Sequence, residues 1–108
     1  MILRQLHILA AGHHQEIMQV LHRLINAREK WTGKVVATSE EAIAVCREAP
    51  YHIVLLCTGI SDADEAELRE RLTALQPHII IIRHFGGGSG LLESEIRAAL
   101  DARHIRLR

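Results

Sequence analysis

Three short polar stretches follow apolar runs in this chain, and their residue types could support ligand binding or catalysis. The first follows Leu6–Ala10, the second follows Ile53–Leu56, and the third follows the β-branched run Ile79–Ile82. The candidate ligand-binding residues in these stretches are Gly12, His13, His14, Cys57, Thr58, Gly59, His84, Gly86, Gly87, Gly88, Ser89 and Gly90. If the three runs are neighbouring parallel strands, their carboxyl ends place these residues around one crevice.

Histidine and cysteine in this crevice suit Zn²⁺, and three such ligands with a water would make an open metal site. Cys57 could instead be a nucleophile if its pKa were lowered by a helix beginning at Ser61–Asp62 and by a nearby histidine, although the Asp62 carboxylate would oppose a thiolate. A structural interpretation makes His13 and His14 turn residues and Cys57 a small buried hydrophobe. The sequence favours this interpretation, so we assign no catalytic residue, metal or cofactor.

The glycine-rich segment Gly86–Gly90 has two interpretations that remain open. Its backbone N–H groups and the following helix could bind a small anion, with Ser89 as N-cap and an additional donor. The segment lacks the lysine of a phosphate-binding P-loop and the spacing of a dinucleotide fingerprint, so no nucleotide is specified. Alternatively, it is only a turn.

Apolar runs and helical periods alternate along the whole chain. The expected strands are Leu6–Ala10, Lys34–Thr38, His52–Cys57 and His78–Ile82, with His104–Leu107 as a candidate fifth edge strand. The expected helices are Gln15–Arg28, a segment from a capping box at Thr38–Glu41 to Ala49, Asp62–Gln76 with a second box at Asp62 and Glu65, and Leu91–Asp101. This alternation predicts an α/β fold, a flavodoxin-like three-layer sandwich whose parallel sheet has four or five strands in the order 2-1-3-4-5.

Length and composition limit the range of functions. The 108 residues form one expected domain, 1–108, and 13 Lys and Arg balance 13 Asp and Glu, so no net field attracts nucleic acid or a membrane. The chain contains no apolar span long enough to cross a membrane and no signal-peptide pattern. Cys46 and Cys57 are too few for a disulfide framework and are expected to be reduced, so these features together predict a cytoplasmic protein. Near-neutral charge, eight histidines and candidate exposed residues Phe85, Leu91 and Leu92 suggest a homodimer.

Several segments resemble a bacterial response-regulator receiver domain of the CheY-like type. The resemblance covers residues 1–76 and rests on Leu6–His13, on Val-Val-Ala-Thr-Ser-Glu-Glu-Ala-Ile at 35–43, and on Tyr-His-Ile-Val-Leu-Leu at 51–56. It implies the fold and a role in signal transduction. The family's Mg²⁺-binding acidic pair would fall on Ala11 and Gly12, and its phosphoacceptor aspartate on Cys57. Without these carboxylates, the resemblance implies a degenerate receiver that does not transfer phosphate.

The same strand ends also resemble those of cobalamin-binding domains. Residues 11–16, Thr58-Gly59-Ile60 and Gly86-Gly87 occupy the places of that family's three motifs, but its aspartate and following glycine are absent at the first place. Our leading hypothesis is therefore a non-enzymatic receiver-like module that contacts a protein partner, with a candidate anion site at the glycine loop. The alternative is a ligand-binding, metal-binding or Cys-based catalytic domain that uses the crevice.

Overall fold

The protein alternates strands and helices, as its sequence pattern predicts. The computed structural model describes residues 1–84 and 89–108, so Phe85, Gly86, Gly87 and Gly88 of the predicted glycine loop lie outside the described residues. The strands are β1 (Ile2–Leu3), β2 (Leu6–Ala11), β3 (Trp31–Val36), β4 (Ile53–Leu56), β5 (Ile80–Arg83) and β6 (Arg106–Leu107). The helices are α1 (Gln15–Asn26), α2 (Ser39–Glu48), α3 (Asp62–Leu75) and α4 (Ser89–Ala102).

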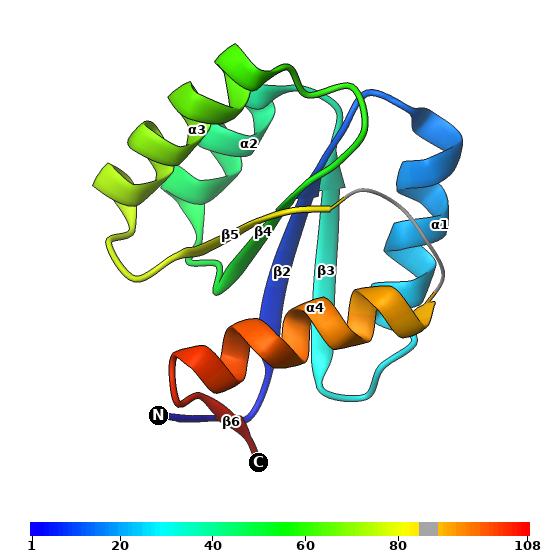
Figure 1. Ribbon diagram of the computed structural model, residues 1–108, viewed down its shortest axis with the longest axis vertical. Coiled ribbons are helices and arrows are strands. Elements are labelled where there is room, and N and C mark those ends of the chain that lie inside the picture. The colour runs from blue at the N-terminus through cyan, green and yellow to red at the C-terminus, as the bar shows by residue number, and fades with distance from the viewer. Residues whose placement is uncertain (85–88) are drawn as a thin grey trace.

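Four of the strands form one parallel sheet in the order β3-β2-β4-β5 (Figure 1). In its centre, Leu9 of β2 lies opposite Val54 of β4, which lies opposite Ile81 of β5. The expectation of a fifth edge strand in this sheet was wrong in its pairing. Residues 106–107 form β6, which pairs in parallel with β1, a strand that the sequence did not predict. A strand of two residues shows no apolar period, so local pattern could not reveal β1.

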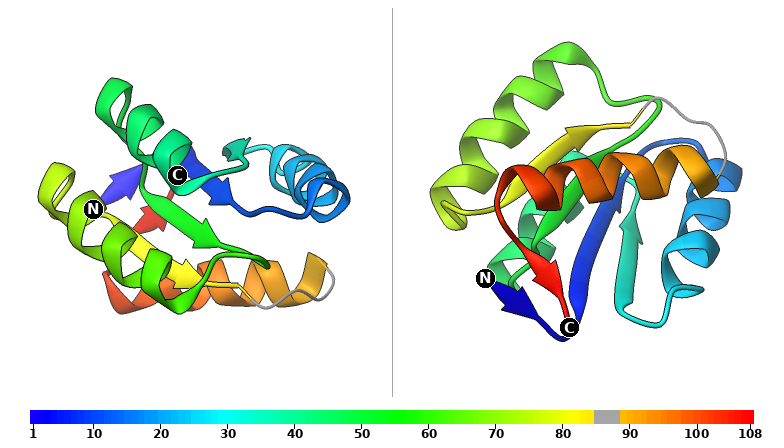
Figure 2. Two further views of the ribbon diagram at one scale, coloured as in Figure 1. Left: turned by 90° about the horizontal axis from the view of Figure 1, so that it is seen from above. Right: turned by 60° about the horizontal axis from the view of Figure 1, so that its bottom comes forward.

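Helices cover both faces of the sheet because alternate residues of β2 and β4 are buried on opposite sides. Ile8 and Leu55 pack in one apolar cluster with α1 and α4, and Leu9 and Val54 pack in another with α2 and α3. Figure 2 shows α4 crossing the strands, with both chain ends at the β1–β6 pair. None of the helices in residues 1–84 and 89–108 has the length and apolar character needed to cross a lipid bilayer.

The N-caps of the helices agree with the sequence at one place and differ at another. The Thr38 hydroxyl accepts from the backbone N–H of Glu41 at 3.1 Å, which confirms the predicted cap of α2. The predicted box at Asp62 was wrong by one residue, because Ser61 is extended and accepts from the N–H of Asp64 at 3.1 Å. Asp62 is therefore the first helical residue.

The start of α4 also differs from the prediction. The helix begins at Ser89 instead of Leu91, so Ser89 is its first residue and not its N-cap. Leu91 is 48 % exposed, whereas Leu92 is 2 % exposed and packs in the core with α1. Leu92 was therefore wrongly expected in an exposed apolar patch, because successive helical residues point about 100° apart and only one of the two leucines can face solvent.

Each outer strand of the sheet has a side chain hydrogen-bonded to its free edge. On β3, the Asn26 side chain accepts from the Gly33 N–H at 3.0 Å and donates to the Gly33 carbonyl at 3.1 Å. On β5, Arg69 of α3 donates to the carbonyl of Ile81 at 3.4 Å. These contacts occupy backbone groups that another strand would need.

The strand β3 begins earlier than the sequence predicts and contains a glycine, Gly33. The expected strand was Lys34–Thr38, because Gly33 was assigned to a loop, but β3 starts at Trp31 and includes the glycine. A Cβ atom on Gly33 would lie 2.3 Å from Cγ2 of the fully buried Ile25. The glycine therefore lets α1 approach the strand closely.

We expect Gly33→Ala to lower the free energy of unfolding by about 1–3 kcal/mol, because the added methyl group overlaps Ile25 in a packed core. Gly90→Ala is the matched control, since a Cβ there meets nothing within 4 Å and alanine favours a helix by up to about 1 kcal/mol. Urea unfolding followed by circular dichroism measures both. Equal stability of Gly33→Ala and the wild type would contradict this packing.

Candidate functional site

The predicted crevice corresponds to the carboxyl edge of the four-stranded sheet. Pairing continues one residue beyond the strands: Gly12 N–H donates to Val36, Cys57 N–H to Ala11, and His84 N–H to Leu56, at 3.1, 2.8 and 2.9 Å. The structure therefore places Gly12, Cys57 and His84 along one edge. Parallel strands present ligands at this edge, and most often where the chain reverses direction across the sheet, which here is between β2 and β4.

The ends of β2 and β4 are packed directly against each other. A Cβ atom on Gly12 would lie 2.8 Å from Sδ of Met18 and 2.9 Å from Cβ of Cys57. Any larger residue at position 12 would therefore force α1 or β4 to move. Gly12 is required for this close approach, and no ligand fits between the two strand ends.

His13 and Gly59 contact each other directly after the ends of β2 and β4. His13 N–H donates to the carbonyl of Thr58 at 3.2 Å, and a Cβ on Gly59 would lie 2.8 Å from Cβ of His13. Gly59 has a φ of +97°, a conformation that glycine adopts without strain. The β4–α3 turn and the start of the β2–α1 turn thus pack on each other.

His14 has a structural role that differs from the predicted one. Its Nδ1 atom accepts from the backbone N–H of Ile17 at 3.3 Å, so the imidazole is the N-cap of α1. A histidine nitrogen can replace the usual serine or aspartate oxygen here because it also carries a lone pair. The hydrogen bond directs His14 along the helix start and not toward Cys57.

Cys57 is a buried hydrophobe and not an activated thiol. It is 1 % exposed, and burial raises the pKa of its thiol to about 12, with the opposing effect of Arg83 too small to offset it and Glu95 adding to the rise. Burial likewise raises the pKa of the Cys46 thiol. Since the thiolate is the nucleophile, Cys57 is inert at neutral pH.

The sequence reasoning missed the partner of His84. The imidazole is 2 % exposed, and its Nδ1 lies 2.5 Å from Oε1 of Glu95 on α4. This contact joins the end of β5 to α4. The available signal was the position of Glu95 three residues after the buried Leu92, which places both on one helical face.

Arg83, the last residue of β5, was also absent from the sequence-based site. Its guanidinium donates to the carbonyl of Ile60 at 2.7 Å and lies 3.5 Å from the Glu65 carboxylate. These contacts tie β5 to the turn after β4 and to α3. The charged groups at this strand end therefore stabilise the fold and are engaged by the chain itself.

The residues of the predicted zinc constellation do not form a metal site. Within residues 1–84 and 89–108, no group of three or more His, Cys, Asp or Glu side chains lies close enough to hold a metal ion. This applies to His13, His14, Cys57, Asp62 and His84. His14 and His84 are engaged elsewhere, and Cys57 would have to lose a proton at a strongly raised pKa.

A groove of about 480 Å³ opens beside the predicted crevice, on the side of β3. Its lining residues are Gly12, His13, Gln15, Met18, Gln19, Val35, Val36, Ala37 and Glu41. Of the predicted ligand-binding residues that the structure describes, Gly12 and His13 line this groove. This groove therefore lies between α1 and the end of β3, and neither Cys57 nor His84 is among its described lining residues.

A second polar pair lies at the opposite, amino edge of the sheet. The backbone N–H of His7 donates to Nδ1 of the His52 ring at 2.9 Å, and the backbone N–H of His52 donates to the carbonyl of His7 at 2.9 Å. The centroids of the two imidazole rings are 5.6 Å apart. Burial lowers the pKa of His52, and the charge of His7 lowers it further. Protonation of Nδ1 would also remove the acceptor of the first hydrogen bond.

No family model matches this chain, and no curated protein matches it either. The receiver resemblance therefore rests on the sequence segments at 6–13, 35–43 and 51–56 and on the α/β architecture.

We expect His52 to make the protein less stable as the pH falls below about 6.5. The unfolded chain binds this proton at the ordinary pKa of 6.5, while the folded protein binds it only at lower pH, so stability is full above 6.5 and declines toward the folded pKa. His52→Asn keeps an acceptor for the His7 N–H and does not titrate. Urea unfolding between pH 7.5 and pH 5 should therefore show a shallower decline for His52→Asn, and equal slopes would contradict the assignment.

Proposed function

We propose that this chain is a receiver-like protein-interaction module of the bacterial cytoplasm that does not accept a phosphoryl group. It acts in signal transduction by contact, as a homodimer or with another protein partner. The proposal includes a flavodoxin-like fold, and the parallel order β3-β2-β4-β5 with helices on both faces is compatible with it.

The observation that carries the proposal is the absence of carboxylates from Ala11, Gly12 and Cys57, at the carboxyl ends of the strands where receivers hold Mg²⁺ and phosphate. Ala11 is buried, Gly12 offers no side chain, and Cys57 is buried with its pKa raised to about 12. Transfer of a phosphoryl group needs a nucleophile and a cation that neutralises the developing charge. The described residues supply neither at this edge, while the surrounding core remains fully packed.

The ligand-binding alternative retains one supporting observation, the groove beside Gly12 and His13. Its lining combines amide, imidazole and carboxylate groups from Gln15, His13 and Glu41 with the apolar side chains of β3. A small ligand in this groove would be consistent with the contact function. The metal-binding and Cys-based catalytic forms of the alternative have no such support among the described residues.

Incubation with acetyl phosphate and Mg²⁺ tests the first part of the proposal. We expect no phosphoryl adduct in the intact mass, because the Cys57 thiol remains protonated and inaccessible. A receiver with its acidic site intact is the positive control in the same buffer. Iodoacetamide should label Cys57 only in denaturant, and an adduct or rapid labelling in the folded protein would refute the proposal.

Sedimentation velocity over a concentration series tests the homodimer. Leu91 at the start of α4 is the proposed contact, so Leu91→Glu should give a monomer under conditions where the wild type is a dimer. Leu75→Glu, at a residue that is 40 % exposed on α3, is the matched control and should remain a dimer. A wild-type monomer at every concentration, or equal dissociation of both variants, would remove the homodimer from the proposal.

A further inference from the structure

The two ends of the chain form a small ribbon with one apolar face and one basic face. In the β1–β6 pair, Ile2 lies opposite Arg106 and Leu3 opposite Leu107, and the Arg108 N–H donates to the carbonyl of Leu3 at 2.7 Å. Leu3 and Leu107 are partly buried against the core. Because strand residues alternate between faces, Ile2, Arg4, Arg106 and Arg108 share the outer face.

The ribbon concentrates positive charge in a chain whose net charge is zero. Residues 1–5 and 103–108 contain four of the 13 Lys and Arg residues, namely Arg4, Arg103, Arg106 and Arg108, and none of the 13 Asp and Glu residues. The remainder of the chain is therefore acidic. A chain with balanced total charge therefore has a local basic surface, which attracts anions.

Five arginines form ion pairs, whereas the ribbon arginines share their lack of a described side-chain partner with Arg23, Arg47 and Arg103, and differ from Arg23 and Arg47 in being clustered at one pocket. Arg28 and Arg97 pair with Glu93, Arg69 and Arg83 with Glu65, and Arg71 with Glu67. Throughout the part of the chain that the structure describes, the guanidinium groups of Arg4, Arg106 and Arg108 form no hydrogen bond or ion pair. Their five N–H donors each are available to a ligand.

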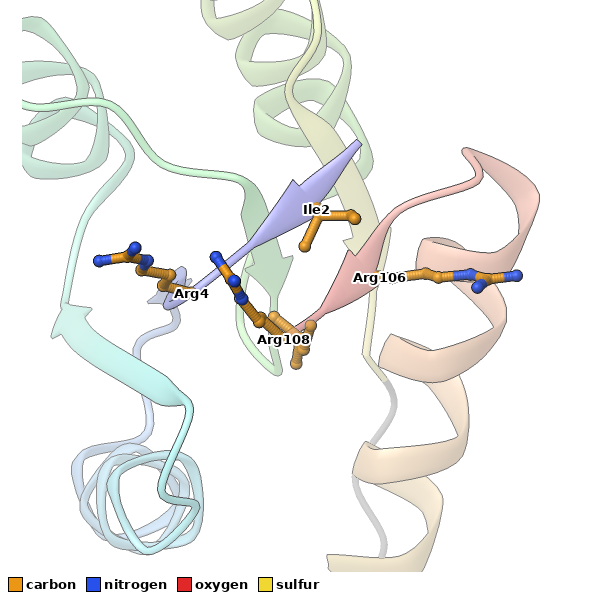
Figure 3. A pocket seen from close by; sticks show the side chains of 5 residues that line it. Ile2, Arg4, Arg106 and Arg108 are labelled. Carbon is orange, nitrogen blue, oxygen red and sulfur yellow. The ribbon is translucent and has the colours of Figure 1, made fainter.

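A pocket of about 470 Å³ lies at this face, lined by Ile2, Arg4, Arg106, Leu107 and Arg108. Figure 3 shows Arg4 and Arg108 on one side of Ile2 and Arg106 extending to the other. Arg4 and Arg108 follow directly on the paired residues of the two strands, so they come from neighbouring backbones. None of these described lining residues has an acidic side chain.

We propose that this ribbon pocket is a binding site for a phosphoryl group, held mainly by Arg4 and Arg108, with Arg106 at its rim. The planar guanidinium fork matches phosphate oxygens bidentately, and two arginines from neighbouring backbones supply enough positive charge for a dianion rather than a single carboxylate. Ile2 and Leu107 supply an apolar contact for the rest of the ligand. The inference is independent of the proposed function, because the ribbon lies at the opposite end of the strands from Cys57.

The test is calorimetric titration of the tag-free protein with inorganic pyrophosphate, since both chain ends lie at the site. We expect saturable binding that the double variant Arg4→Gln/Arg108→Gln weakens by about tenfold or more, because it removes two charge-assisted contacts. Arg23→Gln/Arg47→Gln is the matched control, since it removes the same charge from exposed positions on α1 and α2 and should bind like the wild type. Circular dichroism verifies that both variants fold.

A second arm distinguishes a free phosphate from a lipid headgroup. Flotation with phosphatidylcholine vesicles, with and without phosphatidate, shows whether Arg4 and Arg108 bind the phosphoryl group in a bilayer. Binding to either probe that requires these two arginines supports the site. Binding to neither probe, or equal weakening by the control variant, overturns it. Self-association at low salt that Arg4→Gln/Arg108→Gln abolishes, without pyrophosphate or vesicle binding, also overturns it by assigning the ribbon to the acidic surface of a second copy.

Discussion

The burial of β2 and β4 on both faces is the constraint on which the rest of this structure depends. Their side chains enter two separate apolar clusters, so every backbone N–H and carbonyl of these strands must be satisfied within the sheet. Neighbouring parallel strands provide this pairing, and parallel strands require crossover helices, which cover the two faces. Polar side chains of these strands are then confined to His7 at the start of β2 and to the positions beyond the strand ends, after Gly12 and Cys57.

The same burial continues past the strand ends and removes reactivity from the edge where parallel sheets usually hold ligands. Gly12 and Cys57 extend the sheet pairing by one residue, and their close contact leaves no gap for water or a cation. Low polarity then keeps the Cys57 thiol protonated, which strengthens the apolar packing in turn. Close apolar packing therefore both stabilises this end of the sheet and keeps the Cys57 thiol unreactive.

The sequence predicted the elements whose signals are local and missed those that depend on tertiary contacts. The β-branched run at β5 and the cap at Thr38 need only their neighbours to be recognised. Gly33 lies in a strand on which α1 packs closely, and Glu95 of α4 contacts His84 at the end of β5. The spacing of Glu95 from Leu92 places it on the inner face of α4 but does not specify this partner on another element. Pairing between chain ends is the most distant contact of all, so β1 and its pairing with the expected strand at the C-terminal end were the largest omission.

The distribution of paired and unpaired groups indicates where this protein can form contacts. The Asn26 side chain is hydrogen-bonded to the backbone of Gly33 on the outer strand β3, and Arg69 is hydrogen-bonded to the carbonyl of Ile81 on the outer strand β5. Addition of another strand at these residues would first have to break these hydrogen bonds. Within residues 1–84 and 89–108, the guanidinium groups of Arg4, Arg106 and Arg108 have no side-chain partner, so their N–H donors are available to an external anion. The lateral edges of the sheet are therefore occupied at these residues by side chains of the same chain, whereas the basic face of the ribbon keeps its donors for the anion that we propose there.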